Sequence, residues 1–117
     1  TTRYYWGDDP NYTLIGNYAW FDLNADLATH DVGGKLANPW GLYDMMGNVS
    51  EWCLDYYAPY DTTNLTNPTG PVSGTDRVIR GGTWYSLKET CRSAKRGSLT
   101  NYMRNKYLGF RLVREHP

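Results

Sequence analysis

The stretch Asn38-Pro-Trp-Gly-Leu-Tyr-Asp-Met-Met-Gly-Asn-Val-Ser-Glu-Trp-Cys53 carries most of the information about the fold. Its apolar side chains recur at a spacing that would place them on one face of a helix: Leu42, Met45, Met46, Val49, Trp52 and Cys53. Gly47-Asn48 opposes a helix, because glycine is about 1 kcal/mol worse than alanine in a helix interior and asparagine is also poor. The stretch therefore predicts a tight turn that leads into a short strand over 48–54.

Three further runs in the C-terminal third show strand-like alternation. They are Arg77-Val-Ile-Arg-Gly-Gly-Thr-Trp84, Cys91-Arg-Ser-Ala-Lys-Arg96 and Leu108-Gly-Phe-Arg-Leu-Val113. We expect these runs to form one antiparallel sheet. The connections over 85–90 and 97–107 are polar and irregular but contain rings and flexible apolar side chains, which is the composition of adaptable binding loops.

The rest of the chain predicts loops rather than regular structure. Gly, Pro, Asn and Asp residues that favour turns punctuate the segments 7–10, 22–26 and 33–34, and the segment 58–75 is rich in Pro, Thr, Asn, Gly and Ser. Five Trp, eleven Tyr and two Phe stand beside twelve Gly and six Pro. Because large rings bury much area per residue, this composition suits a loop-rich fold with short strands.

Length and charge narrow the function classes. A chain of 117 residues has room for one domain or part of one. Twelve Lys and Arg balance twelve Asp and Glu, so no broad positive field would hold a nucleic acid. No apolar run approaches the roughly 20 residues of a membrane-spanning helix, and two cysteines do not make a disulfide scaffold. We expect neither nucleic acid nor membrane among the partners.

The quoted stretch and the three C-terminal runs together resemble the formylglycine-generating-enzyme family, also called sulfatase-modifying-factor domains. The resemblance implies an α+β, C-type-lectin-like fold that is loop-rich, with a small antiparallel sheet and little helix. Arg3-Tyr-Tyr-Trp-Gly-Asp8 resembles the middle of such a domain. We therefore expect residues 1–117 to be the C-terminal part of one family domain, either a fragment or a chain that the N-terminal portion or another chain completes.

Two calcium sites follow from the resemblance. The first would use the Asp44 and Glu51 side chains with the carbonyl groups of Gly47 and Val49, oxygen ligands that suit a hard cation. The alternative from the residues alone is that Asp44 caps a turn and Glu51 pairs with an arginine. The second set comprises the Asn17 side chain, the Tyr18 carbonyl, Asn24 and the Asp26 carbonyl. Both ions would be structural and would stabilise loops.

The family's oxidases convert a sulfatase cysteine to formylglycine with a copper ion held by two thiolates. Counted on from Gly81-Gly82 without gaps, Ser86 stands at the first thiolate position and Cys91 at the second. An alignment anchored on Arg-Ser-Ala-Lys-Arg instead makes Cys91 a core residue. Because either alignment leaves the pair incomplete, we assign no catalytic residue, and a disulfide between Cys53 and Cys91 stays open.

The two histidines, His30 and His116, belong to no metal-ligand spacing. We expect surface or hydrogen-bonding roles for them.

The C-terminal part also resembles the variable region of diversity-generating-retroelement proteins built on this fold. In those proteins adenine-specific mutagenesis rewrites surface codons while the strands stay fixed. Many residues of both loops fit substitution from AAC codons, whereas Lys88, Glu89, Met103 and Lys106 do not. The candidate ligand-binding residues are Tyr85, Ser86, Leu87, Lys88, Glu89, Thr90, Ser98, Thr100, Asn101, Tyr102, Arg104, Asn105 and Tyr107.

The sequence thus predicts a calcium-stabilised module that binds a protein or other surface ligand through the two loops. Tyrosine supplies stiff contact area, and Ser, Thr and Asn supply adaptable hydrogen bonds. The alternatives are a formylglycine-generating oxidase, active or degenerate, and a structural subunit of a larger assembly.

Overall fold

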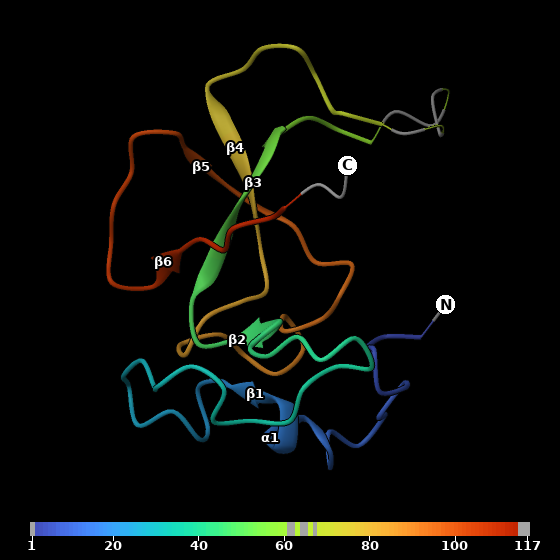
Figure 1. The fold of residues 1–117 in the computed structure, drawn as a ribbon, viewed down its shortest axis with the longest axis vertical. Helices are drawn as coiled ribbons and strands as arrows, with labels where there is room; N and C mark the ends of the chain where they lie inside the picture. Colours follow the sequence, from blue (N-terminus) through green and yellow to red (C-terminus); the bar gives the residue numbers. More distant parts are fainter. Residues whose placement is uncertain (1, 61–62, 64–65, 67, 115–117) are drawn as a thin grey trace.

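The computed structural model describes residues 2–60, 63, 66 and 68–114 and contains one short helix and six short strands in these residues (Figure 1). The elements are α1 (Ile15–Tyr18), β1 (Ala19–Trp20), β2 (Met46–Gly47), β3 (Ser50–Tyr56), β4 (Asp76–Arg80), β5 (Gly97–Thr100) and β6 (Leu108–Gly109). Loops connect them over most of the described chain, as the turn-forming residues predict.

The larger sheet has the strand order β5-β4-β3-β6. Its β3–β4 and β4–β5 pairs are antiparallel, whereas β6, which lies in the last of the three predicted runs, is parallel to β3, so these runs do not form one antiparallel sheet as expected. The register of β3 and β4 shifts between Trp52 and Tyr56, which marks a bulge in β3. The strand predicted over 48–54 is confirmed as β3, two residues further along the chain.

The strand predicted over Cys91–Arg96 is wrong. Cys91 is fully buried, and the Lys95 amide donates to the Arg92 carbonyl at 3.0 Å, which closes a turn. Strand β5 begins only at Gly97, inside the segment predicted to be irregular. A Cβ atom at Gly97 would lie 3.0 Å from Ile79 Cγ1, so a residue without a side chain suits the start of β5 against β4.

The smaller sheet consists of the parallel pair β1–β2 and contains the turn that Gly47-Asn48 predicts. Both residues have positive φ angles, 73° for Gly47 and 60° for Asn48. A Cβ atom at Gly47 would lie 2.0 Å from the Trp20 carbonyl oxygen, which excludes every residue but glycine from this backbone position. The Asn48 amide donates to that same carbonyl at 2.8 Å. The backbone conformation of Gly47 thus outweighs the helical spacing of the apolar residues around it.

The hydrophobic core lies where the N-terminal third meets the segment 81–91. Its buried residues are Tyr4, Ile15, Ala19, Phe21, Met46 and Cys91, and Tyr5, Trp6 and Tyr12 pack against them. Trp6 stacks between Tyr4 and Tyr18, with ring centroids 4.4 Å apart in both pairs. Aromatic side chains therefore make up much of the core in a region that has little regular structure.

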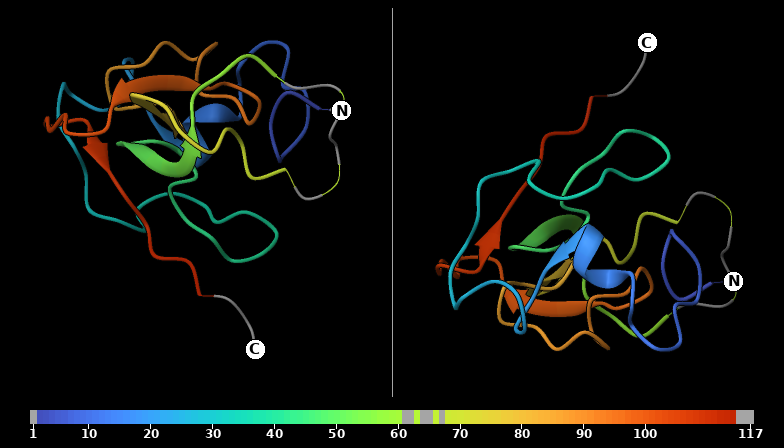
Figure 2. Two further views of the ribbon diagram at one scale, coloured as in Figure 1. Left: turned by 90° about the horizontal axis from the view of Figure 1, so that it is seen from above. Right: turned by 90° about the horizontal axis from the view of Figure 1, so that it is seen from below.

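The segment after β6 leaves the body of the molecule (Figure 2). Phe110, Leu112 and Val113 on this segment are exposed. No helix in the described part of the chain is long and apolar enough to cross a lipid bilayer.

Candidate binding face, cavities and metal ligands

The first candidate loop, 85–90, has a fixed backbone and outward-facing side chains. Trp84 before the loop and Cys91 after it are buried. The Ser86 hydroxyl accepts a hydrogen bond from the Thr83 amide at 2.9 Å, and the Thr90 amide donates to the Leu87 carbonyl at 2.9 Å. Tyr85 is 67% exposed and Leu87 60% exposed. The buried flanking residues and the turn hydrogen bonds thus position these two side chains at the surface.

The same loop contacts the N-terminal third of the chain. The Tyr4 hydroxyl donates to the Lys88 carbonyl at 3.0 Å, and the Lys88 ammonium lies 4.6 Å from the centroid of the Tyr12 ring. The Asp22 amide donates to the Ser86 carbonyl at 3.1 Å. Ser86, Lys88 and Thr90 are only half-buried, whereas Glu89 is exposed.

The second candidate segment, 97–107, starts as strand β5 and continues as an exposed loop. Ser98 and Thr100 are half-buried in the strand, and Asn105 is half-buried near β6. Tyr102 is 76% exposed and Tyr107 40% exposed. Asn101 and Arg104 are also exposed.

The structure divides the predicted binding residues between two ends of the larger sheet. Lys106 lies 5.1 Å from the Trp84 ring centroid, and the Tyr107 carbonyl accepts from the Ser50 amide, so this end of the second segment approaches the first loop. Thr100 pairs instead with Asp76, at the end of β4 remote from Gly81. Ser98, Thr100, Asn101 and Tyr102 therefore extend the surface along β5 rather than joining residues 85–90.

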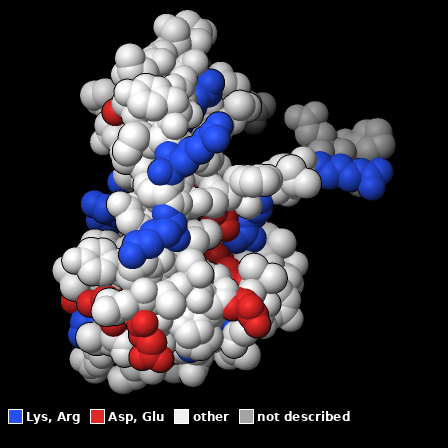
Figure 3. Space-filling model, turned by 90° about the vertical axis from the view of Figure 1, so that its left-hand side faces the viewer, with Lys and Arg blue, Asp and Glu red and all other residues white. Residues whose placement is uncertain are grey.

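Basic side chains are prominent on the side of the molecule that carries β5 and the segment leading to β6. In Figure 3, Lys and Arg side chains cross the middle of this face, and Asp and Glu side chains gather at its lower end. Arg104 and Lys106 are exposed on the segment itself. Although the chain has a formal net charge of zero, this face separates the two signs of charge.

A small cavity of about 220 Å³ lies between the first loop and the start of β5. Its lining includes Ser50, Gly82, Ser86, Thr90 and Lys95. A Cβ atom built on Gly82 would lie 3.4 Å from Ser86 Oγ and 2.9 Å from Cys91 Sγ. Ser86 and Cys91, the two residues at the oxidase's thiolate positions in the alignment without gaps, thus lie against the same glycine.

Neither cysteine forms a disulfide, so the bond left open between Cys53 and Cys91 is absent. Burial raises the pKa of the Cys91 thiol from 9.0 to about 12, with Asp22 and Glu89 adding to the effect. A thiol in this environment is neutral at physiological pH and is a poor metal ligand. Cys53 is half-buried, and burial raises its pKa as well.

A larger cavity was missed by the sequence analysis, which assigned the segment 58–75 to a surface loop. It measures about 480 Å³ and lies between β3, β4 and parts of that segment. Cys53, Asp55, Arg80 and Arg96 contribute polar groups to it. These residues come from distant parts of the chain, so no local motif indicates the cavity.

The first calcium-ligand set has one free oxygen and one engaged carboxylate. Asp44 Oδ2 accepts from the Gly33 amide at 2.8 Å, whereas its buried Oδ1 has no hydrogen-bond partner in the described part of the chain. Both Glu51 carboxylate oxygens accept from Arg111, which also donates to the carbonyls of Tyr43 and Asp44. The alternative for Glu51, pairing with an arginine, is confirmed. The unpartnered Asp44 oxygen nevertheless fits a cation ligand, with the Gly47 and Val49 carbonyls in the same turn segment.

The second set is explained largely by hydrogen bonds within the chain. The Asn24 side chain accepts from the Phe21 amide at 2.8 Å and donates to the Ala19 carbonyl at 2.9 Å. The Asn17 backbone bonds with Leu14 and Leu36. Tyr18 and Asp26 belong to the same region, where Asp26 adopts a positive φ of 49°. The amide of Asn24 therefore needs no cation to be satisfied.

Among the described residues, no three His, Cys, Asp or Glu side chains gather as a metal site would require. His30 Nε2 lies 3.0 Å from the Ala25 carbonyl oxygen, and its ring stacks on Trp20, which confirms a hydrogen-bonding role. His116 lies outside the described residues.

Residues 1–116 match the family model described as the sulfatase-modifying factor enzyme 1-like domain. The chain is 40% identical over 83 residues to the formylglycine-generating enzyme of Mus musculus, covering 68% of this chain and 22% of the relative. It is 46% identical over 83 residues to the serine/threonine-protein kinase pkn1 of Chlamydia caviae, covering 67% of this chain and 13% of the relative.

Among solved structures, the variable protein 1 of Treponema denticola superposes with a TM-score of 0.78 at 39% identity. The match covers 83% of this chain and 36% of that protein. The chain thus spans well under two thirds of each of these proteins, and the superposition shows the C-type-lectin-like fold that the sequence motifs imply.

Proposed function

Because the chain belongs to the sulfatase-modifying factor enzyme 1-like domain family, we propose that it is a ligand-binding module of the variable-protein kind. In this proposal the aromatic core and the strands β3, β4 and β6 form a constant scaffold. The segments 85–90 and 97–107 present changeable side chains to a protein or other surface ligand.

The main support for the proposal is the contrast, within residues 84–91, between buried side chains and large side chains that are exposed. Trp84 is 5% exposed and Cys91 0%, whereas Tyr85 and Leu87 between them exceed half exposure. An exposed tyrosine on a fixed backbone offers a large contact area with little entropy to lose on binding. Tyr102, beyond β5, is 76% exposed, although no residue over 97–107 is buried.

The charge distribution indicates the kind of ligand. Arg104 and Lys106 are exposed beside Tyr102 and Tyr107. Aromatic and arginine side chains are the commonest hot spots of protein interfaces. We therefore expect the ligand to be a protein whose contact surface is acidic, since opposite charges accelerate association.

We also propose calcium at the first ligand set. The support is the buried Asp44 oxygen without a hydrogen-bond partner, because a buried unpaired carboxylate oxygen is costly. Asp44 would hold the ion with the carbonyl groups of Gly47 and Val49, while Glu51 stays paired with Arg111. The second set, around Asn24, has less support because its amide is already satisfied at both ends.

A second candidate function, the family's oxidase activity, is favoured by the juxtaposition of Ser86 and Cys91 against Gly82. Copper(I) chemistry needs two thiolates, and Ser86 offers a hydroxyl while Cys91 is buried with a raised pKa. We expect no formylglycine from a sulfatase peptide incubated with the protein, copper, dioxygen and a thiol reductant. Formylglycine that disappears in Cys91→Ser would refute the binding proposal and establish the oxidase.

A third candidate, a structural subunit completed by a further part of the domain or another chain, is favoured by the exposed apolar Phe110, Leu112 and Val113. Size-exclusion chromatography with light scattering tests this candidate. A monomer that melts cooperatively contradicts it, whereas association that Leu112→Ser abolishes supports it.

The gene's flanking DNA tests the binding proposal. We expect a near-copy of codons 77–113 that differs only where the copy carries adenine, beside a reverse-transcriptase gene. Absence of such a copy would remove the case for retroelement diversification, leaving a fixed ligand, the oxidase and the structural subunit to be separated at the bench.

A further inference from the structure

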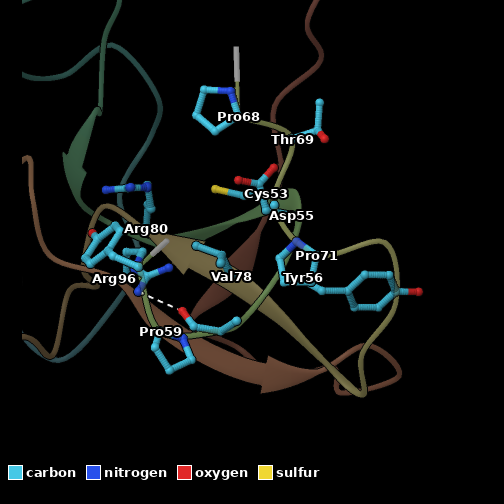
Figure 4. Close-up of a pocket in the computed structure, with 13 residues that line it drawn as sticks. Cys53, Asp55, Tyr56, Pro59, Pro68, Thr69, Pro71, Val78, Arg80 and Arg96 are labelled. Atoms are coloured by element: carbon cyan, nitrogen blue, oxygen red, sulfur yellow. Dashed lines mark hydrogen bonds between the residues drawn. The ribbon is translucent and has the colours of Figure 1, made fainter. Parts of the chain in front are cut away.

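The 480 Å³ cavity has the size and lining of a small-molecule site. Figure 4 shows Arg80 and Arg96 on one side of it and Cys53 and Asp55 on the other, with Val78 between them. Tyr60 and three prolines complete much of the apolar wall, namely Pro59, Pro68 and Pro71. A mainly apolar wall with a few convergent polar groups is typical of ligand pockets.

The two guanidinium groups are not neutralised within the cavity. Arg96 Nη2 donates to the Ala58 carbonyl and Arg80 Nη1 to the Ser93 carbonyl, each at 3.0 Å. In the described part of the chain, neither arginine forms an ion pair with Asp55 or with any other carboxylate. Since each guanidinium has five N–H donors, each arginine has donors left for an acceptor in the cavity. Two cations against one carboxylate leave the lining with a net positive charge.

Arg96 is held in place by aromatic rings rather than by a counter-ion. Its guanidinium carbon lies 3.7 Å from the Tyr60 ring centroid and 4.9 Å from the Tyr57 ring centroid. Stacking on a ring orients the planar guanidinium without consuming its hydrogen-bond donors. The group is therefore preorganised for an anion, which lowers the entropy lost on binding.

The wall opposite the arginines is positioned by two close approaches of glycine. A Cβ atom at Gly70 would lie 3.1 Å from Asp55 Cβ, and one at Gly74 would lie 3.1 Å from Tyr56 Cβ. The segment 70–74 can thus pack closely against β3. The cavity is formed by a specific fit between the loop and the sheet.

We propose that this cavity binds a small molecule that carries one anionic group, such as a carboxylate or sulfonate, on a flat aromatic body. The anion is held by Arg80 and Arg96, and the aromatic body lies against the prolines and Val78. This site is separate from the exposed loop residues proposed to bind a protein, so either proposal can fail without the other.

Two probes that differ in one charged group test the proposal. 8-Anilinonaphthalene-1-sulfonate is aromatic and anionic, and N-phenyl-1-naphthylamine has the same rings without the sulfonate. Fluorescence titration of the purified protein gives a Kd for each. We expect the sulfonate to bind, and Arg96→Met to weaken it by about tenfold or more, the scale of a lost charge-assisted hydrogen bond. The Kd of the neutral probe should change less than about twofold, because apolar contact does not depend on the guanidinium charge.

Asp55→Asn should change the sulfonate Kd in the opposite direction, and it leaves Arg96 and its stacking intact. Removing the nearby negative charge should tighten the sulfonate by about threefold, as expected for partly screened charges. Arg92→Met, at an exposed arginine outside the cavity and outside both loops, is the matched control and should leave both Kd values unchanged.

Alkylation of Cys53 by iodoacetamide locates the bound probe. Cys53 lines the cavity and is half-buried, whereas Cys91 is fully buried. Bound sulfonate should slow the labelling of Cys53. Equal affinity for the two probes, an unchanged sulfonate Kd in Arg96→Met, a sulfonate Kd that Asp55→Asn does not tighten, or labelling of Cys53 that the sulfonate does not slow would each overturn the proposal.

Discussion

Replacing Gly47 by alanine should disrupt the fold far more than the same replacement at Gly41. Both residues have positive φ angles, 73° and 76°, so alanine is strained at each by about 1–2 kcal/mol. At Gly41 nothing lies within 4 Å of the added Cβ atom, whereas at Gly47 that atom would lie 2.0 Å from the Trp20 carbonyl oxygen. Gly41→Ala is therefore the control that isolates backbone strain from the steric clash.

The clash at Gly47 can be relieved only by separating β1 from β2. Because Gly81 lies outside β1, a shift of β2 would break both the Asn48–Trp20 and the Gly47–Gly81 backbone hydrogen bonds, each 2.8 Å long. Two lost bonds at about 1 kcal/mol each and the strain of about 1–2 kcal/mol together give about 3–4 kcal/mol before any loss of packing around Met46. This is a large part of the roughly 5–15 kcal/mol that stabilises an ordinary domain.

Near-UV circular dichroism, which monitors tryptophan packing, measures the two effects during thermal unfolding. Gly41→Ala should lower the Tm by about 5 °C, whereas Gly47→Ala should lower it by more than about 15 °C or abolish the cooperative transition. Equal shifts for the two variants would refute the reasoning, since they would mean that Gly47 is needed only for its φ angle.

Three further predictions concern the Arg111–Glu51 pair, the Cys91 thiol and the proposed calcium ion. Arg111→Met should lower the Tm by about 10 °C, because it removes a charge-assisted pair with Glu51 and two hydrogen bonds to backbone carbonyls; a shift within 2 °C would contradict this. The free energy of unfolding should fall between pH 9 and pH 12 by about 4 kcal/mol through Cys91 alone, because the unfolded thiol ionises near its ordinary pKa of 9.0 while the folded pKa is about 12. Urea titrations should show this slope in the native protein and a shallower slope in Cys91→Ala, in which burial still raises the pKa values of Tyr4 and Tyr5. Calcium at 100 times its Kd should stabilise the protein by about 2.7 kcal/mol in differential scanning fluorimetry, and Asp44→Asn should abolish the effect, whereas a Tm insensitive to calcium and chelator would exclude the ion.

Local chemistry predicted the parts of the fold that depend on neighbouring residues. The turn at Gly47-Asn48 follows from backbone preferences and was correct despite the helical spacing around it. The run Cys91–Arg96 was wrongly predicted to be a strand. Its alternation of side chains does not reveal that Cys91 packs in a core formed mostly by residues of the N-terminal third. Cys91 packs in the same core as Tyr4, which is remote in the sequence.

The candidate site was predictable only in part for the same physical reason. The exposure of Tyr85 and Tyr102 could be expected from their polar neighbours. The separation of residues 98–102 from the loop 85–90 depends on the register of β5 on β4, which the sequence does not show. The Glu51–Arg111 pair joins residues 60 positions apart, so the sequence could suggest an arginine but not identify it. The larger cavity needs Cys53, Arg80 and Arg96 to converge, which only the folded chain reveals.

In the proposed function, exposed side chains of the segments 85–90 and 97–107 vary from ligand to ligand while the rest of the domain stays constant. Sequencing this gene from many independent isolates of its source tests that claim most directly. We predict that substitutions concentrate in the codons of exposed residues such as Tyr85, Leu87 and Tyr102, and spare Gly82, Trp84 and Cys91. Substitutions spread evenly along the chain, or absent from both segments, would contradict the account.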